Sequence, residues 1–446
     1  MLYLSNMDEA TQKLQQEAEA VLKQNDRGQH TVPAGDLYPH QWLWDSCFIA
    51  IGLRHLDVER AQTELRSLLK GQWSNGMLPN MIFSDGGKHS RDRQLWRSWV
   101  SPYAPEGVAT SGITQPPMLA EAVVQVGQKL KVAERRSWYK EMLPALIDYH
   151  QWLYSDRDPH QEGLVVLLHP YESGLDNSPP WVSELRKHSL PLWLSLLERA
   201  KLSWVISVFR RDTQHTTLAE RTGDIEAAAD WVAMRRLRRK AYNSEAILSR
   251  SLFAVQDLVF NSILIRANQH LVDMSKAAGH RLPDDLKENM ARSEAALEQL
   301  WDESNWQYFS RSFVSHKLIE EPSIATLLPL YSGSISKNRA AHLVELLKRR
   351  RLFSPSWPVP SVPLNSSAFE PYKYWQGPTW VNTNWLIVDG LERSGFKAEA
   401  DVLRKRTLEL IAKSGMYEYF NPNNSEPAGA PNFSWTAALT IDLLKH

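Results

Sequence analysis

The stretch VNTNWLIVDGLERSGFKAEADVLRKRTLELI, residues 381–411, contains two helical patterns separated by a few residues. In residues 381–391 and 398–411, apolar side chains recur at the three- and four-residue spacing of an amphipathic helix. The connection between them, residues 394–397, is so short that it predicts a helical hairpin. A long loop rich in aromatic residues, glycine and proline, residues 353–377, precedes this pair.

The same alternation of helices with short and long connections recurs along the chain. Helical spacing predicts further helices over residues 10–22, 59–69, 118–130, 139–153, 225–237, 252–274, 286–300 and 340–347. The best strand pattern is Leu164-Val-Val-Leu-Leu168. Further long aromatic loops occupy residues 31–44, 73–112, 169–181 and 416–433. Because disordered segments avoid aromatic residues, we expect these loops to be ordered and to gather at one end of a helical scaffold.

This organisation favours an all-α fold and, within it, an (α/α)6 barrel, which is a toroid of helical hairpins. Its long loops would wall a cavity at one end. The alternative is a helical-repeat solenoid, and the lack of a clear fixed-period repeat counts against it. We expect one catalytic domain over residues 1–446, with residues 180–250 forming an inserted helical lid.

Composition narrows the class of protein. Lys and Arg number 51, and so do Asp and Glu, so the formal net charge of zero predicts no nucleic acid or membrane partner. Basic clusters at residues 234–240 and 348–351 are typical of solvated helix faces or helix ends. The start of the chain lacks a signal-peptide pattern, and charges interrupt the longest apolar region, residues 190–209. We therefore expect a cytoplasmic protein; assembly into a homo-oligomer stays open.

Metal and cofactor chemistry find no support in the motifs. Cys47 is the single cysteine, which excludes an internal disulfide and a cysteine-based zinc cluster. We find no HExxH helix, no close histidine and carboxylate set, no P-loop, no GxGxxG after a strand and no GxSxG. The prediction is therefore that no metal and no cofactor take part. The 18 tryptophans suit the stacking of sugar rings, although a tryptophan-rich core is the alternative.

The loop HPYESGLDNSPPW, residues 169–181, holds two acids, Glu172 and Asp176. Asp176 lies just before an expected helix, whose dipole lowers the pKa of a nearby carboxyl group, whereas burial against Tyr171 and Trp181 would raise it. A general acid at neutral pH needs the effect of burial to prevail. The sequence leaves this open, and a solvated surface turn is the alternative.

A second enclosed acid, Glu418, lies between Tyr417 and Tyr419, where a merely solvating carboxylate would be unusual. Glycoside hydrolysis needs one carboxylic acid to protonate the leaving oxygen and a second carboxylate to act at the anomeric carbon. Asp176 and Glu418 are the two acids most enclosed by aromatic, turn-rich sequence. They form our candidate pair, and structural ion pairs or helix caps are the default alternative.

Other polar groups stand beside large rings in the remaining loops. The spacing of Asp45 at the start of an apolar run favours a helix cap over a grip on sugar hydroxyls. Gln115 precedes two prolines, so a structural role and a ligand contact are both open. Trp375 and Trp380, with Gly377 allowing close backbone approach, form a candidate sugar platform.

Read together, the loops resemble glycoside hydrolase family 63, in its bacterial mannosylglycerate and glucosylglycerate hydrolase branch. The matching motifs follow the order of the family and span nearly the whole chain. They are YPHQWLWD (38–45), QWSNGMLPN (72–80), TSGITQPP (110–117), ESGLDNSP (172–179), YWQGPTW (374–380), YEYFNP (417–422) and SWTAA (434–438). ESGLDNSP and YWQGPTW are the most specific of them.

The resemblance implies an (α/α)6 barrel that hydrolyses an α-glycosidic bond with inversion. Asp176 falls on the general acid of the family and Glu418 on its general base. Asp45 falls on the aspartate that holds sugar hydroxyls, which replaces the cap interpretation. The two catalytic carboxyl groups should then be roughly 6.5–9.5 Å apart, leaving room for water. The expected substrate-binding residues are Tyr38, Trp42, Asp45, Gln115, Tyr171, Gly174, Trp375, Gly377, Trp380 and Trp435.

Three departures bear on the leaving group. Gln376 stands where the family usually has arginine, the loop at residues 83–93 lacks a tyrosine, and residues 431–433 lack the glutamines of related enzymes. Cations that could still receive a carboxylate are Lys88, Arg91, Arg93 and Arg211. We predict an inverting α-glycosidase that releases glucose or mannose from a small glycoside such as glucosylglycerate or mannosylglycerate. The alternatives are an α-glucosidase acting on a disaccharide or oligosaccharide end, and a non-catalytic sugar-binding protein.

Overall fold

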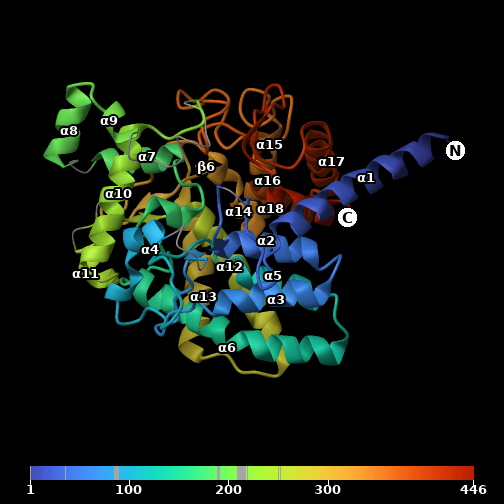
Figure 1. Ribbon diagram of the computed structural model, residues 1–446, viewed down its shortest axis with the longest axis horizontal. Coiled ribbons are helices and arrows are strands. Elements are labelled where there is room, and N and C mark those ends of the chain that lie inside the picture. Colours follow the sequence, from blue (N-terminus) through green and yellow to red (C-terminus); the bar gives the residue numbers. More distant parts are fainter. Residues whose placement is uncertain are drawn as a thin grey trace.

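Helices form most of the structure, a computed structural model that describes residues 2–35, 37–84, 90–187, 191–207, 217, 219–249, 251 and 253–445 (Figure 1). The first helices are α1 (Leu2–Asn25), α2 (Leu43–Leu53), α3 (Val58–Leu69), α4 (Ser90–Trp96), α5 (Leu119–Gly127) and α6 (Val132–Arg157). Then come α7 (Pro179–Lys187), α8 (Leu192–Arg199), α9 (Trp204–Ser207), α10 (Asp224–Arg239), α11 (Ser244–Leu248) and α12 (Leu258–Ala278). The chain ends with α13 (Asp284–Ala296), α14 (Pro329–Ser332), α15 (Lys337–Lys348), α16 (Val381–Arg393), α17 (Lys397–Ser414) and α18 (Ser434–Leu443).

The contacts of one set of helices close on themselves. Among the described helices, α2, α5, α12, α14, α16 and α18 contact one another in that order, and α18 contacts α2. Every residue of α2 and of α18 is buried, as expected for a helix that is apolar on all sides. The N-terminal ends of these helices carry residues of the sequence motifs, since Asp45 and Trp435 lie in first turns and Trp380 is the N-cap of α16.

A second set of helices packs against the first. α1 contacts α18, α3 contacts α2 and α5, α6 contacts α5 and α12, and α17 contacts α16 and α18. These helices bury one face only, as α3 does through Ala61, Leu65 and Leu68, which is what their amphipathic spacing indicates.

The helical hairpin predicted from residues 381–411 is confirmed as α16 packed on α17. The helix predicted over residues 252–274 begins only at Leu258, because the Asp257 carboxylate accepts the amide protons of Val259 and Phe260 and caps it there. Helix α18 was not predicted, since a helix buried on every side shows no periodicity.

The strands are short, and their pairing connects loop segments. They are β1 (Gln41–Trp42), β2 (Met81–Ile82), β3 (Val166–Leu167), β4 (Val255–Gln256), β5 (Trp301–Asp302), β6 (Gln307–Tyr308), β7 (Arg311–Ser312), β8 (Tyr417–Phe420) and β9 (Pro427–Pro431). β1 pairs with β2, β4 joins β3 to β7, β5 pairs with β6 and β8 pairs with β9, all antiparallel. The strand predicted over residues 164–168 is thus reduced to β3.

The segment from α7 to α11 covers the range expected for the insertion. α10 contacts α8 and α9, and it also contacts α4. In Figure 1, α8 and α9 lie at the opposite edge of the molecule from the free end of α1. Across the described ranges, no helix combines the length and the apolar character needed to cross a bilayer.

Candidate active site

The two acids of the loop at residues 169–181 occupy different environments. Glu172 is buried, and its carboxylate accepts hydrogen bonds from Nη1 and Nη2 of Arg157, at 2.9 and 2.8 Å, and from the amide of Leu168 at 2.6 Å. A solvated surface turn is therefore the wrong interpretation, because this buried ion pair anchors the loop from below. Asp176 remains as the acid available for chemistry.

Asp176 is half-buried on this anchored loop. Burial and the nearby charge of Glu418 raise the pKa of Asp176 to about 8, while its own backbone amide works in the opposite direction. The effect of burial prevails, which the sequence alone left open. A pKa near 8 favours the protonated form of Asp176 at neutral pH, which is the form that a general acid requires.

Glu418 lies on β8 and is buried. Its carboxylate accepts the hydroxyl proton of Tyr38 at 2.9 Å and the amide proton of Ala430 at 3.0 Å. Burial raises the pKa of Glu418 to about 7, and these two donors limit the rise because they stabilise the ionised form. The pKa of Glu418 thus stays below that of Asp176, so Glu418 loses its proton first as pH rises. An acid and a base that act as a pair need their pKa values in this order.

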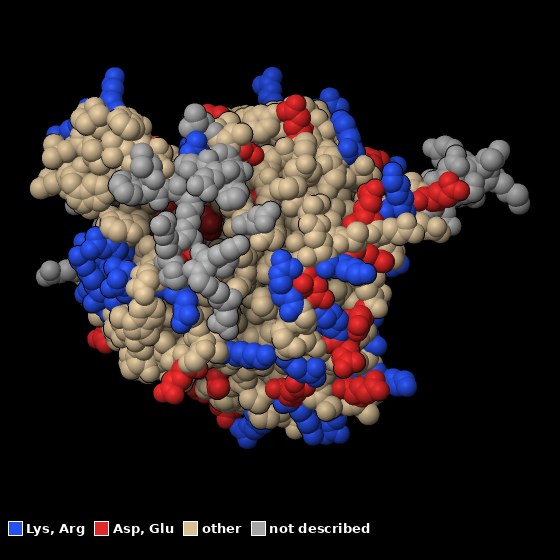
Figure 2. All heavy atoms as spheres, viewed as in Figure 1, with Lys and Arg blue, Asp and Glu red and all other residues tan. Residues whose placement is uncertain are grey.

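Asp45 joins the same cluster. It lies in the first turn of α2, whose N-cap is Trp42, so the cap interpretation is wrong. The side chain is buried, and burial together with the charges of Glu418 and Asp176 raises the pKa of Asp45 well above its ordinary value. Three acids that are remote in the chain therefore act electrostatically on one another. The face shown in Figure 2 is hollowed near its centre, with acidic atoms visible inside the hollow.

Several aromatic rings of the motif loops pack tightly on one another. Trp375 stacks on Trp380 with 3.7 Å between ring centroids and 6° between planes. Trp435 meets Trp380 at 5.8 Å and Trp44 at 5.6 Å. Trp375 and Trp380 are buried, so stacking on each other accounts for them at least as well as the predicted sugar platform.

The predicted glycines have packing reasons of their own. Gly174 has φ +73°, and a Cβ atom there would lie 2.6 Å from the ring of Trp44. A Cβ atom on Gly377 would lie 2.2 Å from the carbonyl oxygen of Glu370. Close approach at Gly377 therefore serves another part of the chain, while Gly174 lets the acid loop reach the rings.

Some residues that were predicted to bind substrate hold the loops to one another. The side chain of Gln115 accepts the amide proton of Trp44 at 3.5 Å, and Tyr171 packs edge-on against His169 with ring centroids 4.6 Å apart. Gln376, which replaces the usual arginine, donates to the carbonyl oxygen of Asn177 at 2.8 Å. The substitution therefore ties the YWQGPTW loop to the residue that follows Asp176.

Sequence reasoning did not single out three residues that interact with Glu418 or with the loop of Asp176. Asn177 accepts the amide proton of Trp375 at 2.8 Å through its side chain. Tyr374, with φ +38°, provides a hydrogen bond that lowers the pKa of Glu418. Glu220 lies near enough to Glu418 for its charge to raise that pKa. Only Tyr374 and Asn177 lay within a recognised motif.

Two of the predicted substrate-binding residues have buried donors without an acceptor. Buried indole nitrogens of Trp42 and Trp435 have no hydrogen-bond acceptor within the described residues, and such orphan donors point to water or ligand. Among the cations suggested for a substrate carboxylate, Arg93 is exposed on α4. Lys88, Arg211 and the side chain of Arg91 lie outside the described residues.

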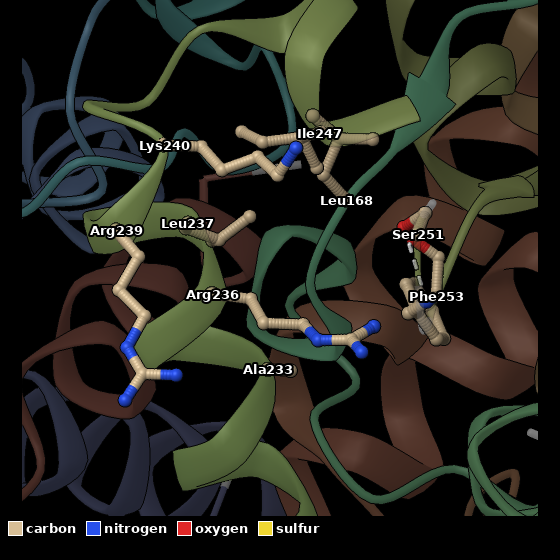
Figure 3. A pocket seen from close by; sticks show the side chains of 9 residues that line it. All are labelled: Leu168, Ala233, Arg236, Leu237, Arg239, Lys240, Ile247, Ser251 and Phe253. Carbon is tan, nitrogen blue, oxygen red and sulfur yellow. Dashed lines mark hydrogen bonds between the residues drawn. The ribbon is translucent and has the colours of Figure 1, made fainter. Parts of the chain in front are cut away.

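A cavity of about 260 Å³ is lined by residues other than the three acids (Figure 3). Arg236, Arg239 and Lys240 line it, together with apolar side chains of neighbouring segments. These cations stand at the C-terminal end of α10, where the helix dipole favours positive charge. The arrangement agrees with the helix-end interpretation of the basic cluster at residues 234–240.

Comparison with known proteins places this geometry in a family. Residues 38–436 match the mannosylglycerate hydrolase MGH1-like glycoside hydrolase domain. The chain is 38% identical to a mannosylglycerate hydrolase of Thermus thermophilus, covering 94% of this chain and 98% of that protein. It is 31% identical to glucosylglycerate hydrolase of Mycolicibacterium hassiacum, covering 95% and 96% of the two chains.

Solved structures agree with the sequence comparison. The crystal structure of a GH63 mannosylglycerate hydrolase from Thermus thermophilus, in complex with Tris and D-glycerate, superposes with a TM-score of 0.86 at 36% identity. The match covers 96% of this chain and 99% of that one. Neutral trehalase from Saccharomyces cerevisiae, at 16% identity and a TM-score of 0.56, shares the fold alone. The chain is therefore a glycoside hydrolase and belongs to the MGH1-like family within glycoside hydrolase family 63.

Proposed function

We propose that this enzyme hydrolyses an α-glycosidic bond with inversion and releases glucose or mannose from glucosylglycerate, mannosylglycerate or a similar small glycoside. The observation that carries the mechanism is the pairing of Asp176, with its pKa at about 8, with Glu418, whose pKa is about 7. The substrate class is supported by the names of the full-length relatives, which are mannosylglycerate and glucosylglycerate hydrolases.

The proposed architecture is an (α/α)6 barrel in a single domain, residues 1–446, with residues 180–250 as an inserted lid. The closed order of contacts from α2 through α5, α12, α14, α16 and α18 supports an inner ring of helices. α1, α3, α6, α13, α15 and α17 would supply the outer ring. The lid assignment is supported by the contact between Glu220 and the hairpin that carries Glu418.

In the proposed reaction, Asp176 donates its proton to the glycosidic oxygen as the bond from that oxygen to the anomeric carbon breaks. A water molecule attacks the anomeric carbon from the opposite face and forms the new carbon–oxygen bond, while Glu418 accepts one of its protons. One water is consumed, Asp176 ends ionised and Glu418 ends protonated. Proton exchange with solvent restores both. Asp45 holds hydroxyls of the sugar, beside the indole donors of Trp42 and Trp435.

A substrate panel with NMR detection tests the proposal. Glucosylglycerate, mannosylglycerate and α-linked disaccharides are compared, and the anomer released first is read from the proton spectrum. Release of the β-anomer of the sugar from glucosylglycerate or mannosylglycerate supports the proposal. Release of the α-sugar overturns inversion, and turnover of disaccharides alone favours the α-glucosidase.

Matched variants separate an enzyme from a sugar-binding protein. Asp176→Asn and Glu418→Gln should each abolish hydrolysis while substrate still raises the melting temperature. Asp284→Asn, in an exposed ion pair with Arg281, is the control and should hydrolyse like the wild type. Equal hydrolysis by all four proteins would overturn the assignment of the two acids.

A further inference from the structure

The hairpin that carries Glu418 contains a β-bulge on the strand opposite that residue. The pairing of β8 with β9 shifts register between Tyr417 and Tyr419. Glu418 alone therefore faces two residues of β9, Gly429 and Ala430. A bulge disrupts the ladder at the extra residue and re-aims the side chains next to it. Gly429, at φ +71°, has the left-handed conformation that such a bulge favours.

Both backbone amides of the bulge donate to carboxylates. The amide of Ala430 donates to Oε2 of Glu418 at 3.0 Å. The neighbouring amide of Gly429 donates to Oε1 of Glu220 at 2.9 Å. A Cβ atom on Gly429 would lie only 2.5 Å from Oε2 of Glu418, so this backbone passes directly against the carboxylate of the base. A shift of the bulge would move Glu418.

Glu220 reaches the bulge from a distant part of the chain. It lies in the turn that precedes α10, within the proposed lid, and its side chain is half-buried. Its Oε2 accepts the amide proton of Thr217 at 2.6 Å, and its backbone amide donates to the Thr217 carbonyl oxygen at 3.2 Å. One oxygen of Glu220 thus holds its own turn, and the other holds Gly429.

We propose that Glu220 is a positioning residue for the general base: it supplies the acceptor that the bulged amide of Gly429 lacks in the ladder and so fixes the direction in which Glu418 points. This inference rests on the proposed function of Glu418. It also means that Glu418 is held in its direction only while Glu220 contacts the hairpin.

The charge of Glu220 gives the inference a readout that a simple stabilising contact would not move. The other titratable groups facing Glu418 are Asp45, Asp176, Tyr38, Tyr374 and Tyr419. The negative charge of Glu220 raises the pKa of Glu418. Its removal should therefore lower that pKa and move the acidic limb of the rate profile to lower pH.

Three variants separate the contact from the charge. Glu220→Gln keeps an oxygen acceptor for Gly429 but loses the charge, so kcat should stay within about 3-fold and the acidic limb should move to lower pH. Glu220→Ala loses both, so kcat should fall about 10-fold to 100-fold, the scale of a misplaced catalytic group. Glu226→Gln is the control, because Glu226 accepts the amide proton of Gly223 at the start of α10. Its pH profile should match that of the wild type.

The outcomes are distinguishable from failure of the proposed function. If the wild type hydrolyses glucosylglycerate or mannosylglycerate and Glu220→Ala keeps its kcat, this inference is wrong and the assignment of Glu418 stands. A fall in melting temperature with unchanged kcat and an unmoved acidic limb in both Glu220 variants also overturns it, since that is the behaviour of a structural contact. Activity retained by Glu418→Gln would instead remove the proposed function.

Discussion

The hydroxyl of Tyr38 donates to the carboxylate of Glu418 at 2.9 Å, across nearly the whole length of the chain. Tyr38 precedes α2, and Glu418 lies on β8 just before the C-terminal helix. The bond stabilises the ionised form of Glu418, so it favours the state that accepts a proton from water. It also joins the two ends of the chain at the point where the chemistry is proposed.

Tyr38→Phe should raise the pKa of Glu418, because the variant removes a donor to the carboxylate while burial remains. The acidic limb of kcat/KM should move to higher pH, and the loss of rate should be largest below pH 7 and shrink above it. Rate measurements across pH check this. Tyr139→Phe, whose hydroxyl bonds the Val124 carbonyl oxygen away from the acids, is the control. A loss of rate that is the same at every pH would contradict the explanation.

The wild-type rate should follow a narrow bell against pH. The acidic limb reports ionisation of Glu418, with pKa about 7, and the alkaline limb reports loss of the Asp176 proton, with pKa about 8. The maximum is therefore expected between pH 7 and 8. On a glycosyl fluoride, whose leaving group needs no proton, Asp176→Asn should turn over and should lack the alkaline limb. An alkaline limb that persists in this variant would mean that another group carries that pKa.

The free energy of unfolding should fall as pH rises from about 4 toward 8, the pKa of Asp176 in the folded chain. The folded-state pKa of Asp176 is raised above its ordinary value near 4, so the native chain binds this proton more tightly than the unfolded chain. This contribution is complete below about pH 4 and is lost as pH rises through 8. The free energy of unfolding of Asp176→Asn should therefore exceed that of the wild type at pH 9, and the difference between the two proteins should be smaller at pH 5. Urea unfolding at the two pH values measures it, and a difference independent of pH would contradict the linkage.

Gly429→Ala should abolish activity, because the added methyl group meets Oε2 of Glu418 at 2.5 Å and φ is +71°. Gly395→Ala is a matched control, since its φ of +86° imposes similar backbone strain while its Cβ meets open space. Each variant should lose about 1 kcal/mol or more of stability from the strain. Only Gly429→Ala should have a lower kcat than the wild type. Equal activity of the two variants would show that close backbone approach at Glu418 is unimportant.

Arg157→Ala should destabilise the protein by roughly 3–5 kcal/mol, because it leaves the buried carboxylate of Glu172 without its counter-charge. The exposed pair of Arg66 and Glu141 offers a comparison, and Arg66→Ala should cost less than about 1 kcal/mol. Equilibrium urea unfolding gives both values. A similarly small loss of unfolding free energy in both variants would mean that water reaches Glu172 when Arg157 is removed.

Local pattern determined much of this protein. The alternation of apolar residues fixed α3, α10, α16 and α17, because an amphipathic helix depends on neighbours three and four residues apart. Enclosure by aromatic residues and turns singled out Asp176 and Glu418, and the motifs indicated the family. These inferences need no knowledge of which distant residues meet.

Tertiary structure decided the rest. Glu172 and Asp176 lie four residues apart in one loop, and only packing shows that Arg157 neutralises the first while burial and Glu418 raise the pKa of the second. The burial that sets these pKa values, and the bonds from Tyr38 to Glu418 and from Gly429 to Glu220, join segments remote in sequence. Desolvation and hydrogen bonding depend on all the atoms around a group, most of which belong to other parts of the chain, so no local stretch encodes them.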